Sequence, residues 1–373
     1  MKLLIVTHVP HYKEQSRYYA YAPYVREMNL WLKNAPQCTV VAPISTEKKG
    51  TIDIPYEHPD IIFFKVPAIA LTSFIKILKT MLVLPLVLIR IIKAMQQADH
   101  IHLRCPGNMG LLGCILQIGF PFKTKSAKYA GNWDPEAKQP WTYRLQKWIL
   151  NNTFLTRRMQ VLVYGNWKNQ SENIRPFFTA TYSETEKQAI QKTVHSGETI
   201  RLLFAGTLVE GKNPIYAIQL LEQIKESIPN ILLDIYGEGK LRRDIEKYVE
   251  VSNLKEHVIL HGNQSQKIIK KACQQSHFVV LPSKSEGWPK AIAEGMFWGC
   301  VPLATAVSCI PDMLAQGKRG VLLQMEVEKD ASAINDLINN PSVFEKKSKA
   351  AQQWSQKYTL DYFEAEIQKL LQQ

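Results

Sequence analysis

The sequence lacks the cysteine patterns that mark a disulfide framework or a zinc site. Its six cysteines are scattered over 373 residues, with no CxxC pair and no Cys/His cluster at zinc-ligand spacing. It also lacks the apolar core of a signal peptide, because only about five apolar residues precede His8 in MKLLIVTHVP. These absences favour a reducing compartment, and we expect a cytoplasmic protein.

No uncharged apolar run in the sequence is long enough to span a bilayer. The most apolar stretch, residues 68–95, is interrupted by four basic residues and Pro85. Its longest uncharged part, residues 80–89, is well below the roughly 20 residues that a spanning helix needs. Two interpretations stay open. The stretch forms one or two helices packed on an N-terminal sheet, or it forms a basic amphipathic surface that docks on anionic lipid.

Acidic residues are scarce in the first half of the chain. Residues 1–180 hold 23 Lys and Arg against 10 Asp and Glu, whereas residues 181–373 hold 23 against 23. The net charge of +13 therefore lies entirely in the first half. Such one-sided charge predicts an anionic partner, either membrane headgroups, phosphorylated substrates or nucleic acid. We expect no nucleic-acid partner, because that half carries no RNP, helix-turn-helix or zinc-finger signature.

Short apolar runs alternate with helix-compatible stretches along the whole chain. The first half contains KLLIVTHV, CTVVAP, IIFFKV, HIHLRCP, SAKYAG and MQVLVYG, and the second half contains RLLFAG, ILLDIYG, HVILHG, FVVLPS, VPLATA and GVLLQ. Apolar strands alternating with helices predict parallel sheets buried on both faces. The length exceeds what one core usually accommodates. The predicted fold class is therefore α/β, with two doubly wound Rossmann-like domains facing a central cleft and a boundary near residues 178–200.

The segment VVLPSKSEGWPKAIAEGMFWGCVPLAT, residues 279–305, places two carboxylates where ligands bind. Glu286 follows the C-terminal end of a predicted strand, the edge at which open parallel sheets bind ligands. Glu294 comes eight residues later, about two turns into a helix expected to open near Pro289, among apolar or small residues that favour its burial. One carboxylate can hold a ribose and the other a transferred sugar. N–H groups from Gly287 to Lys290 lie at a helix N-terminus suited to a diphosphate.

Two further loops carry the same kind of signal more weakly. In ILLDIYGEGKLRRDIEKY, Gly237 and Gly239 follow a strand and bring backbone close to a nucleotide, although such turns also serve as plain connections. In RLLFAGTLVEGKNP, Gly206 ends a strand and Lys212 lies near the next helix. A lysine there can neutralise a diphosphate, although the ordinary alternative is a solvated side chain.

With these residues in view, the second half resembles the retaining group 1 glycosyltransferases, GT-B-fold enzymes that include bacterial mannosyltransferases and relatives of glycogen synthase. The resemblance covers about residues 200–325 and rests on AGTLVEGKNP, DIYGEGKLRRDIE, HVILHGNQSQ and the Glu-x7-Glu segment SEGWPKAIAEGMFWGCVPLAT. It implies an N-terminal acceptor domain of residues 1–185, a donor domain of residues 186–355, and a final helix of residues 356–373 that crosses back to the N-terminal domain.

Carried over by residue, the resemblance implies that Lys212 binds the diphosphate, Glu286 contacts the donor sugar and Glu294 holds the ribose. Glu286 and Lys212 are the catalytic candidates. The donor-binding candidates are Gly206, Thr207, Lys212, Gly237, Gly239, Gly287, Trp288, Pro289, Lys290 and Glu294. Thr207 stands where the family usually has an arginine, so we expect Lys212 to carry more of the diphosphate charge, with Lys290 or Arg104 assisting.

The acceptor side departs further from the family. Where members often carry a histidine, this chain has Gly131 and Asn132, and VPHYKEQSRYY replaces a Gly-Gly loop. The acceptor-side candidates are His8, His102, Arg104 and Asn132, although a histidine near a strand end is more often structural.

The expected function is therefore metal-independent transfer of a hexose-type sugar, with retention, from a UDP- or GDP-linked donor to an acceptor hydroxyl. No Asp-x-Asp motif occurs in the sequence, so we expect no bound metal and no cofactor. The positive first half suits a lipid-linked, polysaccharide or lipopolysaccharide intermediate and peripheral contact with the inner face of an anionic membrane. Alternatives are a nucleotide-sugar epimerase, a phosphorylase, or a non-catalytic basic protein that binds membrane or nucleic acid.

Overall fold

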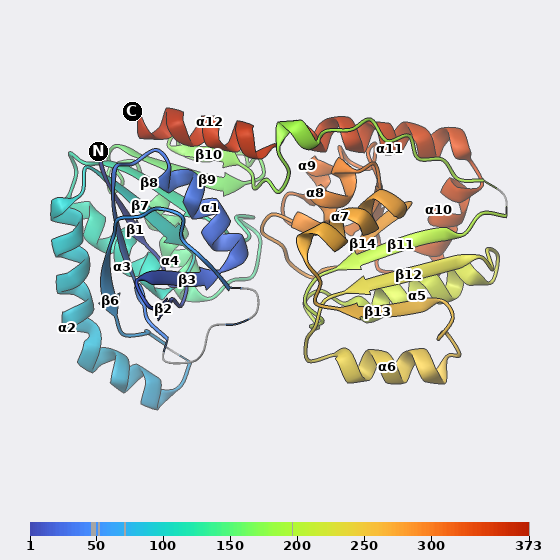
Figure 1. Cartoon of the computed structure of the whole chain (residues 1–373), viewed down its shortest axis with the longest axis horizontal. Coiled ribbons are helices and arrows are strands. Elements are labelled where there is room, and N and C mark those ends of the chain that lie inside the picture. The colour runs from blue at the N-terminus through green and yellow to red at the C-terminus, as the bar shows by residue number, and fades with distance from the viewer. Residues whose placement is uncertain (46–49, 51–52, 71, 196, 373) are drawn as a thin grey trace. The chain divides into compact units, whose positions relative to one another are not determined.

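The structure is a computed structural model that describes residues 1–45, 50, 53–70, 72–195 and 197–372. It divides into two compact units (Figure 1). Unit 1 comprises Met1–Phe177 and Glu364–Gln373, and unit 2 comprises Phe178–Phe363. The boundaries expected at residues 185 and 355 both fall inside unit 2, because segments 178–185 and 356–363 pack within that unit. For example, the Glu184 N–H donates to an Asp361 carboxylate oxygen over 2.6 Å.

Unit 1 is built on a seven-stranded parallel sheet. Its order is β10-β9-β8-β7-β1-β4-β6, and every neighbouring pair is parallel. Chain order runs outward in both directions from the adjacent strands β1 and β7, so the topological switch point lies between them. The strands are β1 (Lys2–Val6), β4 (Gln37–Pro43), β6 (Ile61–Val66), β7 (His100–Cys105), β8 (Thr124–Tyr129), β9 (Met159–Tyr164) and β10 (Ile174–Phe177).

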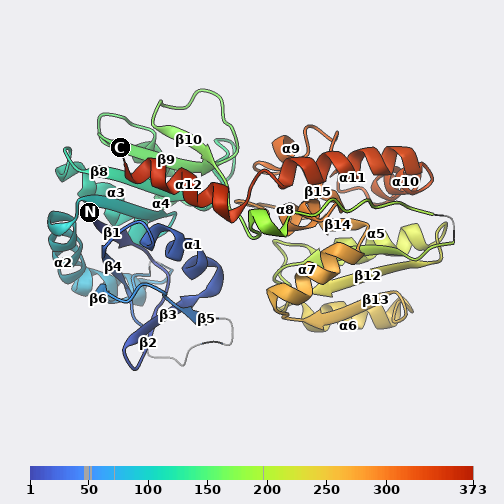
Figure 2. The same cartoon turned by 45° about the horizontal axis from the view of Figure 1, so that its top comes forward.

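The helices of unit 1 lie on both sides of this sheet. The β1–α1–β4 connection and the later β–α–β connections advance in opposite directions along the sheet, so right-handed crossovers place α1 opposite α2, α3 and α4 (Figures 1 and 2). The helices are α1 (Ala22–Leu32), α2 (Phe74–Gln97), α3 (Asn108–Leu116), α4 (Trp141–Leu150) and the 3-10 turn η1 (Gln117–Gly119). The C-terminal helix α12 (Leu360–Leu371) ends in unit 1, where Glu364 pairs with Lys33 at the end of α1 over 3.2 Å.

Unit 1 also contains a small second sheet that the sequence pattern does not predict. It is antiparallel, in the order β2-β3-β5, with β2 (Tyr12–Glu14), β3 (Arg17–Tyr21) and β5 (Asp53–Pro55). β2 and the first part of β3 lie in the VPHYKEQSRYY segment, and the turn between them places Gln15 at a φ of 51°. Its tyrosine-rich, polar sequence lacks the apolar run of a buried strand.

Unit 2 is a six-stranded parallel sheet in the order β13-β12-β11-β14-β15-β16. Its switch point lies between β11 and β14. The strands are β11 (Ile200–Ala205), β12 (Ile231–Tyr236), β13 (Val258–Gly262), β14 (Phe278–Leu281), β15 (Val301–Thr305) and β16 (Val321–Leu323). The helices are α5 (Pro214–Lys225), α6 (Arg242–Val251), α7 (Gln266–Gln275), α8 (Lys290–Phe297), α9 (Ile310–Met313), α10 (Val327–Ile338), α11 (Pro341–Ser355) and the 3-10 turn η2 (Glu184–Glu186). Two doubly wound Rossmann-like units confirm the predicted fold class.

Most of the apolar stretch of residues 68–95 lies in one helix, α2, which begins at Phe74 and contains Pro85. Residue 71, at the start of this stretch, lies outside the described residues. The second half of α2 packs on the sheet through Val87, Ile91 and Met95, as the structural interpretation predicts. Within the described part of the chain, no helix is long and apolar enough to cross a membrane.

Candidate functional site

Two loops meet at the switch point of unit 2. The loop after β11 spans residues 206–213 and the loop after β14 spans residues 282–289. The Lys284 N–H donates to the Gly211 carbonyl over 2.9 Å, which joins the two loops. The site predicted from Glu286 and Lys212 therefore lies at the carboxyl edge of the central strands, where doubly wound sheets bind ligands.

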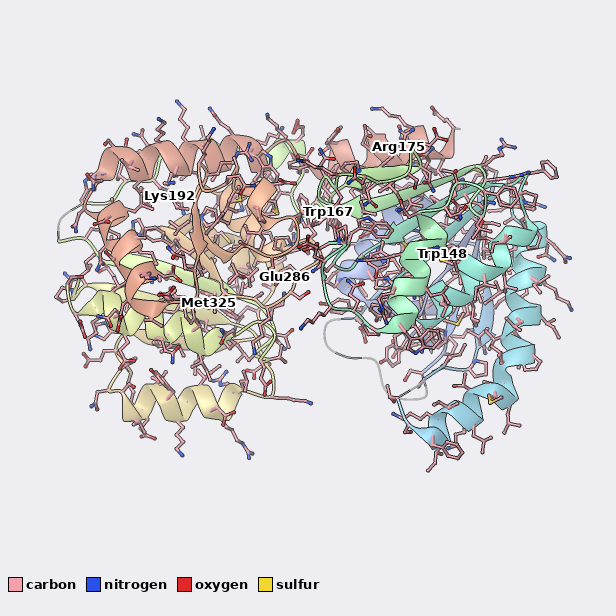
Figure 3. The ribbon with its side chains drawn as sticks, turned by 180° about the vertical axis from the view of Figure 1, so that it is seen from behind. Trp148, Trp167, Arg175, Lys192, Glu286 and Met325 are labelled. Carbon is pink, nitrogen blue, oxygen red and sulfur yellow. The ribbon has the colours of Figure 1, made fainter. Side chains whose placement is uncertain are left out.

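Lys212 and Glu286, which lie 74 residues apart in sequence, form an ion pair in this site. The Lys212 Nζ lies 2.5 Å from the Glu286 Oε1. The Glu286 side chain, which is labelled in Figure 3, is 5% exposed, and that of Lys212 is 30% exposed. Asn213, in the left-handed region at a φ of 51°, turns the loop into Pro214 at the start of α5 and so fixes Lys212 at the loop's end. The pair leaves the ammonium group reachable from solvent while its carboxylate partner is buried.

Glu294 lies elsewhere in the loop–helix segment, with a different partner. It is the fifth residue of α8, little more than one turn from the helix start at 3.6 residues per turn, rather than about two turns. It is half-buried, and its Oε1 accepts a hydrogen bond from the Thr181 hydroxyl over 2.8 Å. The following residue, Gly295, lets α8 approach β14, because a Cβ there would lie 2.5 Å from Val279 Cγ1.

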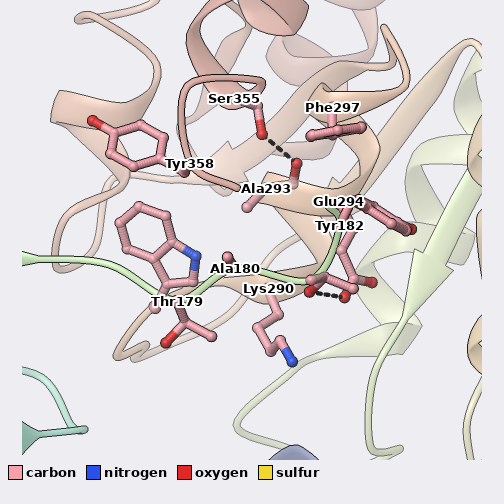
Figure 4. A pocket seen from close by; sticks show the side chains of 11 residues that line it. Thr179, Ala180, Tyr182, Lys290, Ala293, Glu294, Phe297, Ser355 and Tyr358 are labelled. Atoms are coloured by element: carbon pink, nitrogen blue, oxygen red, sulfur yellow. Dashed lines mark hydrogen bonds between the residues drawn. The ribbon is translucent and has the colours of Figure 1, made fainter. Parts of the chain in front are cut away.

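A small cavity of unit 2 lies beside Glu294. Segment 179–182, α8 and the end of α11 line it, and Lys290 and Tyr358 are among its lining residues (Figure 4). The dashed lines of Figure 4 mark the bond from Thr181 to Glu294 and the 2.6 Å bond from the Ser355 hydroxyl to a carbonyl of α8. Glu286 is not among the described residues that line this cavity. The two glutamates therefore differ in their partners and in their surroundings.

The N-terminus of α8 begins at Lys290, with Pro289 as the cap residue. Proline has no N–H, so of the predicted backbone donors only Gly287, Trp288 and Lys290 can donate. Among the described residues no side chain caps the helix, which leaves the positive end of its dipole available to an anion. The indole ring of Trp288 packs with Tyr358 at 5.7 Å between ring centroids.

Gly237 and Gly239 serve the packing of two loops against each other. A Cβ at Gly237, whose φ is +140°, would lie 1.9 Å from the Gly206 carbonyl oxygen. A Cβ at Gly239 would lie 2.3 Å from the Leu208 carbonyl oxygen. Thr207, between these contacts, is exposed. The glycine pair thus brings the loop after β12 into backbone contact with the loop that carries Lys212.

We expect the substitution Gly237→Ala to destabilise the protein by about 3 kcal/mol, because it adds a backbone clash to a positive φ. Urea denaturation measures the change. Gly211→Ala is the matched control, since nothing lies within 4 Å of a Cβ there and its φ is ordinary. Gly197→Ala, with a φ of +85° and the same open space, isolates the backbone cost, which we expect at about 1 kcal/mol. Equal losses of stability for Gly237→Ala and Gly197→Ala would show that the protein relieves the backbone clash at position 237.

Comparison with known proteins identifies the family of this unit. Residues 185–357 match the family model described as glycosyl transferases group 1. The matched residues make up just under half of the chain. The match covers nearly all of unit 2, including both loops and both glutamates.

The relatives of this chain are distant. An uncharacterized glycosyltransferase of Methanocaldococcus jannaschii is 27% identical over 194 residues, 52% of this chain and 53% of that protein. The poly(glycerol-phosphate) alpha-glucosyltransferase of Bacillus subtilis is 28% identical over 169 residues, 43% of this chain and 24% of that protein. The matches thus span about half, or less, of these curated relatives. The structure of Anabaena HepE with UDP and glucose covers 100% of this chain and 99% of its own, with a TM-score of 0.71 and 13% identity, a likeness of fold.

In unit 1, His8 lies at the switch point. It follows β1, keeps contact with solvent, and packs against the loop after β7, where a Cβ on Gly107 would lie 2.8 Å from the His8 Nδ1. Partial desolvation and the positive charge of Arg104 lower the pKa of His8 below its ordinary value. The imidazole is therefore neutral at pH 7 and able to accept a proton.

His102 is structural. Its ring is fully buried, lies 4.0 Å from the Trp31 ring between centroids, and its Nδ1 lies 2.8 Å from the Ser126 hydroxyl. Burial holds the pKa of His102 well below its ordinary value. An acceptor cannot reach it, which corrects its place among the acceptor-side candidates. Asn132, in the loop after β8, uses its side-chain oxygen to accept the Asp134 N–H over 2.9 Å.

Arg104 belongs to a buried ionic network that the sequence did not indicate. Its guanidinium binds both carboxylate oxygens of Glu27, and the Lys128 Nζ lies 3.1 Å from the same carboxylate. The side chains of Arg104, Glu27 and Lys128 are 12%, 7% and 0% exposed. Burial alone would raise the pKa of Glu27, but the charges of Arg104 and Lys128 outweigh it and lower that pKa to about 2. Arg104 is therefore engaged inside unit 1 by a carboxylate of α1.

Proposed function

We propose that the protein transfers a hexose-type sugar from a UDP- or GDP-linked donor to an acceptor hydroxyl, with retention of configuration and without a bound divalent metal. The observation that carries this proposal is the ion pair of Lys212 with buried Glu286 at the switch point of a unit that matches the family model. The structure of Anabaena HepE with UDP and glucose supports a nucleotide sugar as the donor class.

The proposed chemistry is electrostatic. When the bond between the anomeric carbon and the diphosphate oxygen breaks, negative charge grows on the departing diphosphate. Lys212 and the uncapped N-terminus of α8 offer positive charge to it. Glu286 accepts hydrogen bonds from sugar hydroxyls and holds the Lys212 ammonium in place. Glu294, already held by Thr181, is assigned to the ribose hydroxyls.

We assign the acceptor to unit 1 and propose a lipid-linked, polysaccharide or lipopolysaccharide intermediate at the cytoplasmic face of the membrane. The positive excess of residues 1–180 supports an anionic acceptor, as does the poly(glycerol-phosphate) in the name of the Bacillus relative. Neutral His8, at the switch point of unit 1, is the candidate that receives the acceptor proton. Replacing His8 with glutamine should then lower transfer to the acceptor and leave donor hydrolysis unchanged.

A panel of nucleotide sugars, read by thermal shift and by release of nucleoside diphosphate, tests the proposal. A true donor at 100 times its Kd should add about 2.7 kcal/mol of stability through mass action, and release should continue in the presence of EDTA. An epimerase would convert the donor sugar without releasing the nucleotide, and a phosphorylase would require inorganic phosphate. The thermal midpoint of a non-catalytic basic binding protein would change with salt concentration and with none of the nucleotide sugars in the panel. Any of these three results would contradict the proposal.

A further inference from the structure

Helix α2 carries two apolar faces, and only one of them packs on the protein. Thr80, Val87, Ile91, Ala94 and Met95 are its buried residues. Other large apolar side chains stand in solvent, with exposures of 81% for Phe74, 77% for Leu82, 67% for Ile75, 64% for Met81, 54% for Leu78 and 52% for Ile89. A helix on the surface of a globular unit ordinarily presents polar residues on that side.

The two faces lie on roughly opposite sides of the helix. At about 100° per residue, these six residues, the most exposed large apolar side chains of α2, fall within about a third of the circumference, and the buried residues centre about half a turn away. Ile77 and Leu86, which are 38% and 42% exposed, lie outside that third. Of the described residues in the first half of α2, Thr80 alone is buried, where its hydroxyl donates to the Ala70 carbonyl over 3.1 Å. The first half of α2 therefore extends along the periphery of unit 1 with its outer apolar face uncovered.

Positive charge borders this outer face, and negative charge is absent from it. α2 contains Lys76, Lys79, Arg90 and Lys93 and no Asp or Glu. On the same helical geometry, Lys79, Arg90 and Lys93 lie along one margin of the exposed apolar face. Long basic side chains can lay their stems on apolar surface and keep the charge at a polar boundary.

Exposed aromatic side chains and basic residues also occur on another helix of the same layer. α4 lies on the same side of the sheet as α2. On and after α4, Trp141 is 62% exposed, Trp148, which is labelled in Figure 3, is 61% exposed, and Phe154 is 71% exposed. The Arg157 guanidinium lies 4.8 Å from the centre of the Phe154 ring. Tryptophan beside basic residues is the composition of protein surfaces at the headgroup level of a bilayer.

We propose that the outer face of α2 docks on an anionic phospholipid bilayer, with its apolar side chains between the headgroups and its basic side chains at the phosphates. The proposal needs no nucleotide sugar, so it stands apart from the proposed catalytic function. A second copy of the chain fits this face less well. A two-fold interface would set the cations of α2 against those of its partner with no carboxylate on either helix.

Flotation of the full-length protein with phospholipid vesicles tests the docking. Vesicles of equal parts phosphatidylglycerol and phosphatidylcholine should carry the protein, and vesicles of phosphatidylcholine alone should carry at least about tenfold less. The double variant Leu78→Glu with Leu82→Glu should lose about tenfold or more in partitioning. Both side chains are exposed, so its thermal midpoint should stay at the wild-type value. Val251→Glu, a 73% exposed position on α6 of unit 2, is the matched control and should bind like wild type.

Insertion is tested separately through a label at Leu82. All six native cysteines are buried, so Leu82→Cys provides one accessible thiol for an environment-sensitive fluorophore. Its emission should shift to the blue on the anionic vesicles. Unchanged emission, undiminished flotation of the double-glutamate variant, or equal binding to neutral vesicles would each overturn the proposal. So would absence of vesicle binding together with a dimer in analytical ultracentrifugation that the double variant dissociates.

Discussion

Replacing Glu286 with glutamine is expected to lower kcat for sugar transfer by about 100- to 1,000-fold, the loss typical of removing one preorganised electrostatic group from an active site. The carboxylate is buried and lies 2.5 Å from the Lys212 ammonium, so glutamine keeps the shape and removes the charge that positions the lysine. Single-turnover release of nucleoside diphosphate, with the donor that the panel selects, measures the effect. Rates equal to wild type would remove Glu286 from the proposed mechanism.

Two further variants separate the role of the pair from a general effect of lost charge. Glu250→Gln breaks the exposed ion pair with Lys255, whose atoms lie 2.7 Å apart in the same unit, and should leave the rate unchanged. Lys212→Ala should lower the rate as well. Because Lys212 and Glu286 touch each other, the double variant should lose far less than the product of the two single losses. Independent, multiplicative losses would show that the two residues act at separate places.

The large sheets were predictable from sequence because strands buried on both faces are continuous apolar runs. All six runs of the first half and all six of the second half form strands of the two parallel sheets. The strands without such runs were missed. β10 is the edge strand IRPF, with one arginine and one proline in four residues. β2 and β3 form a hairpin of polar and tyrosine residues whose pairing depends on its turn.

The loops that carry the site residues were predictable from the sequence, but the contacts between those residues were not. Strand ends and the Glu-x7-Glu spacing identified Glu286, Glu294 and Lys212 one by one. Their partners depend on strand order. This order puts β11 beside β14, although five elements of the chain (α5, β12, α6, β13 and α7) separate Lys212 from β14. Thr181 was not predictable as a partner of Glu294. It belongs to the polar segment at the start of unit 2, and nothing in that sequence places it beside α8.

The position of Glu27 in the sequence is a feature from which a buried ion pair could be predicted. It lies on α1 between Tyr24 and Trp31, on the face of the helix that packs inward, where a carboxylate is out of pattern. Lys128 likewise interrupts the apolar strand SAKYAG. A charged residue at a core position implies a buried partner, since an unpaired buried charge is very costly. Which partner it finds depends on the register of β7 beside β8, which places Arg104 opposite Lys128.

Replacing Glu27 with glutamine is therefore expected to destabilise the protein by about 3–5 kcal/mol at neutral pH, the cost of leaving buried cations without their counter-charge. Urea denaturation measures it. Glu364→Gln, which breaks an exposed pair with Lys33 in the same unit, should cost less than about 1 kcal/mol. A Glu27→Gln protein as stable as wild type would show that the network does not depend on this carboxylate's charge.

The pH dependence of the same comparison gives an independent test. The folded pKa of Glu27, about 2, lies below its ordinary value of 4.5. A group whose pKa is lowered by folding contributes its stability above the ordinary value and loses it as the pH falls toward the folded value. The stability gap between wild type and Glu27→Gln should therefore be constant from neutral pH down to about pH 5 and should narrow below it. A gap that stays constant down to about pH 3 would mean that Glu27 contributes through packing rather than through its charge.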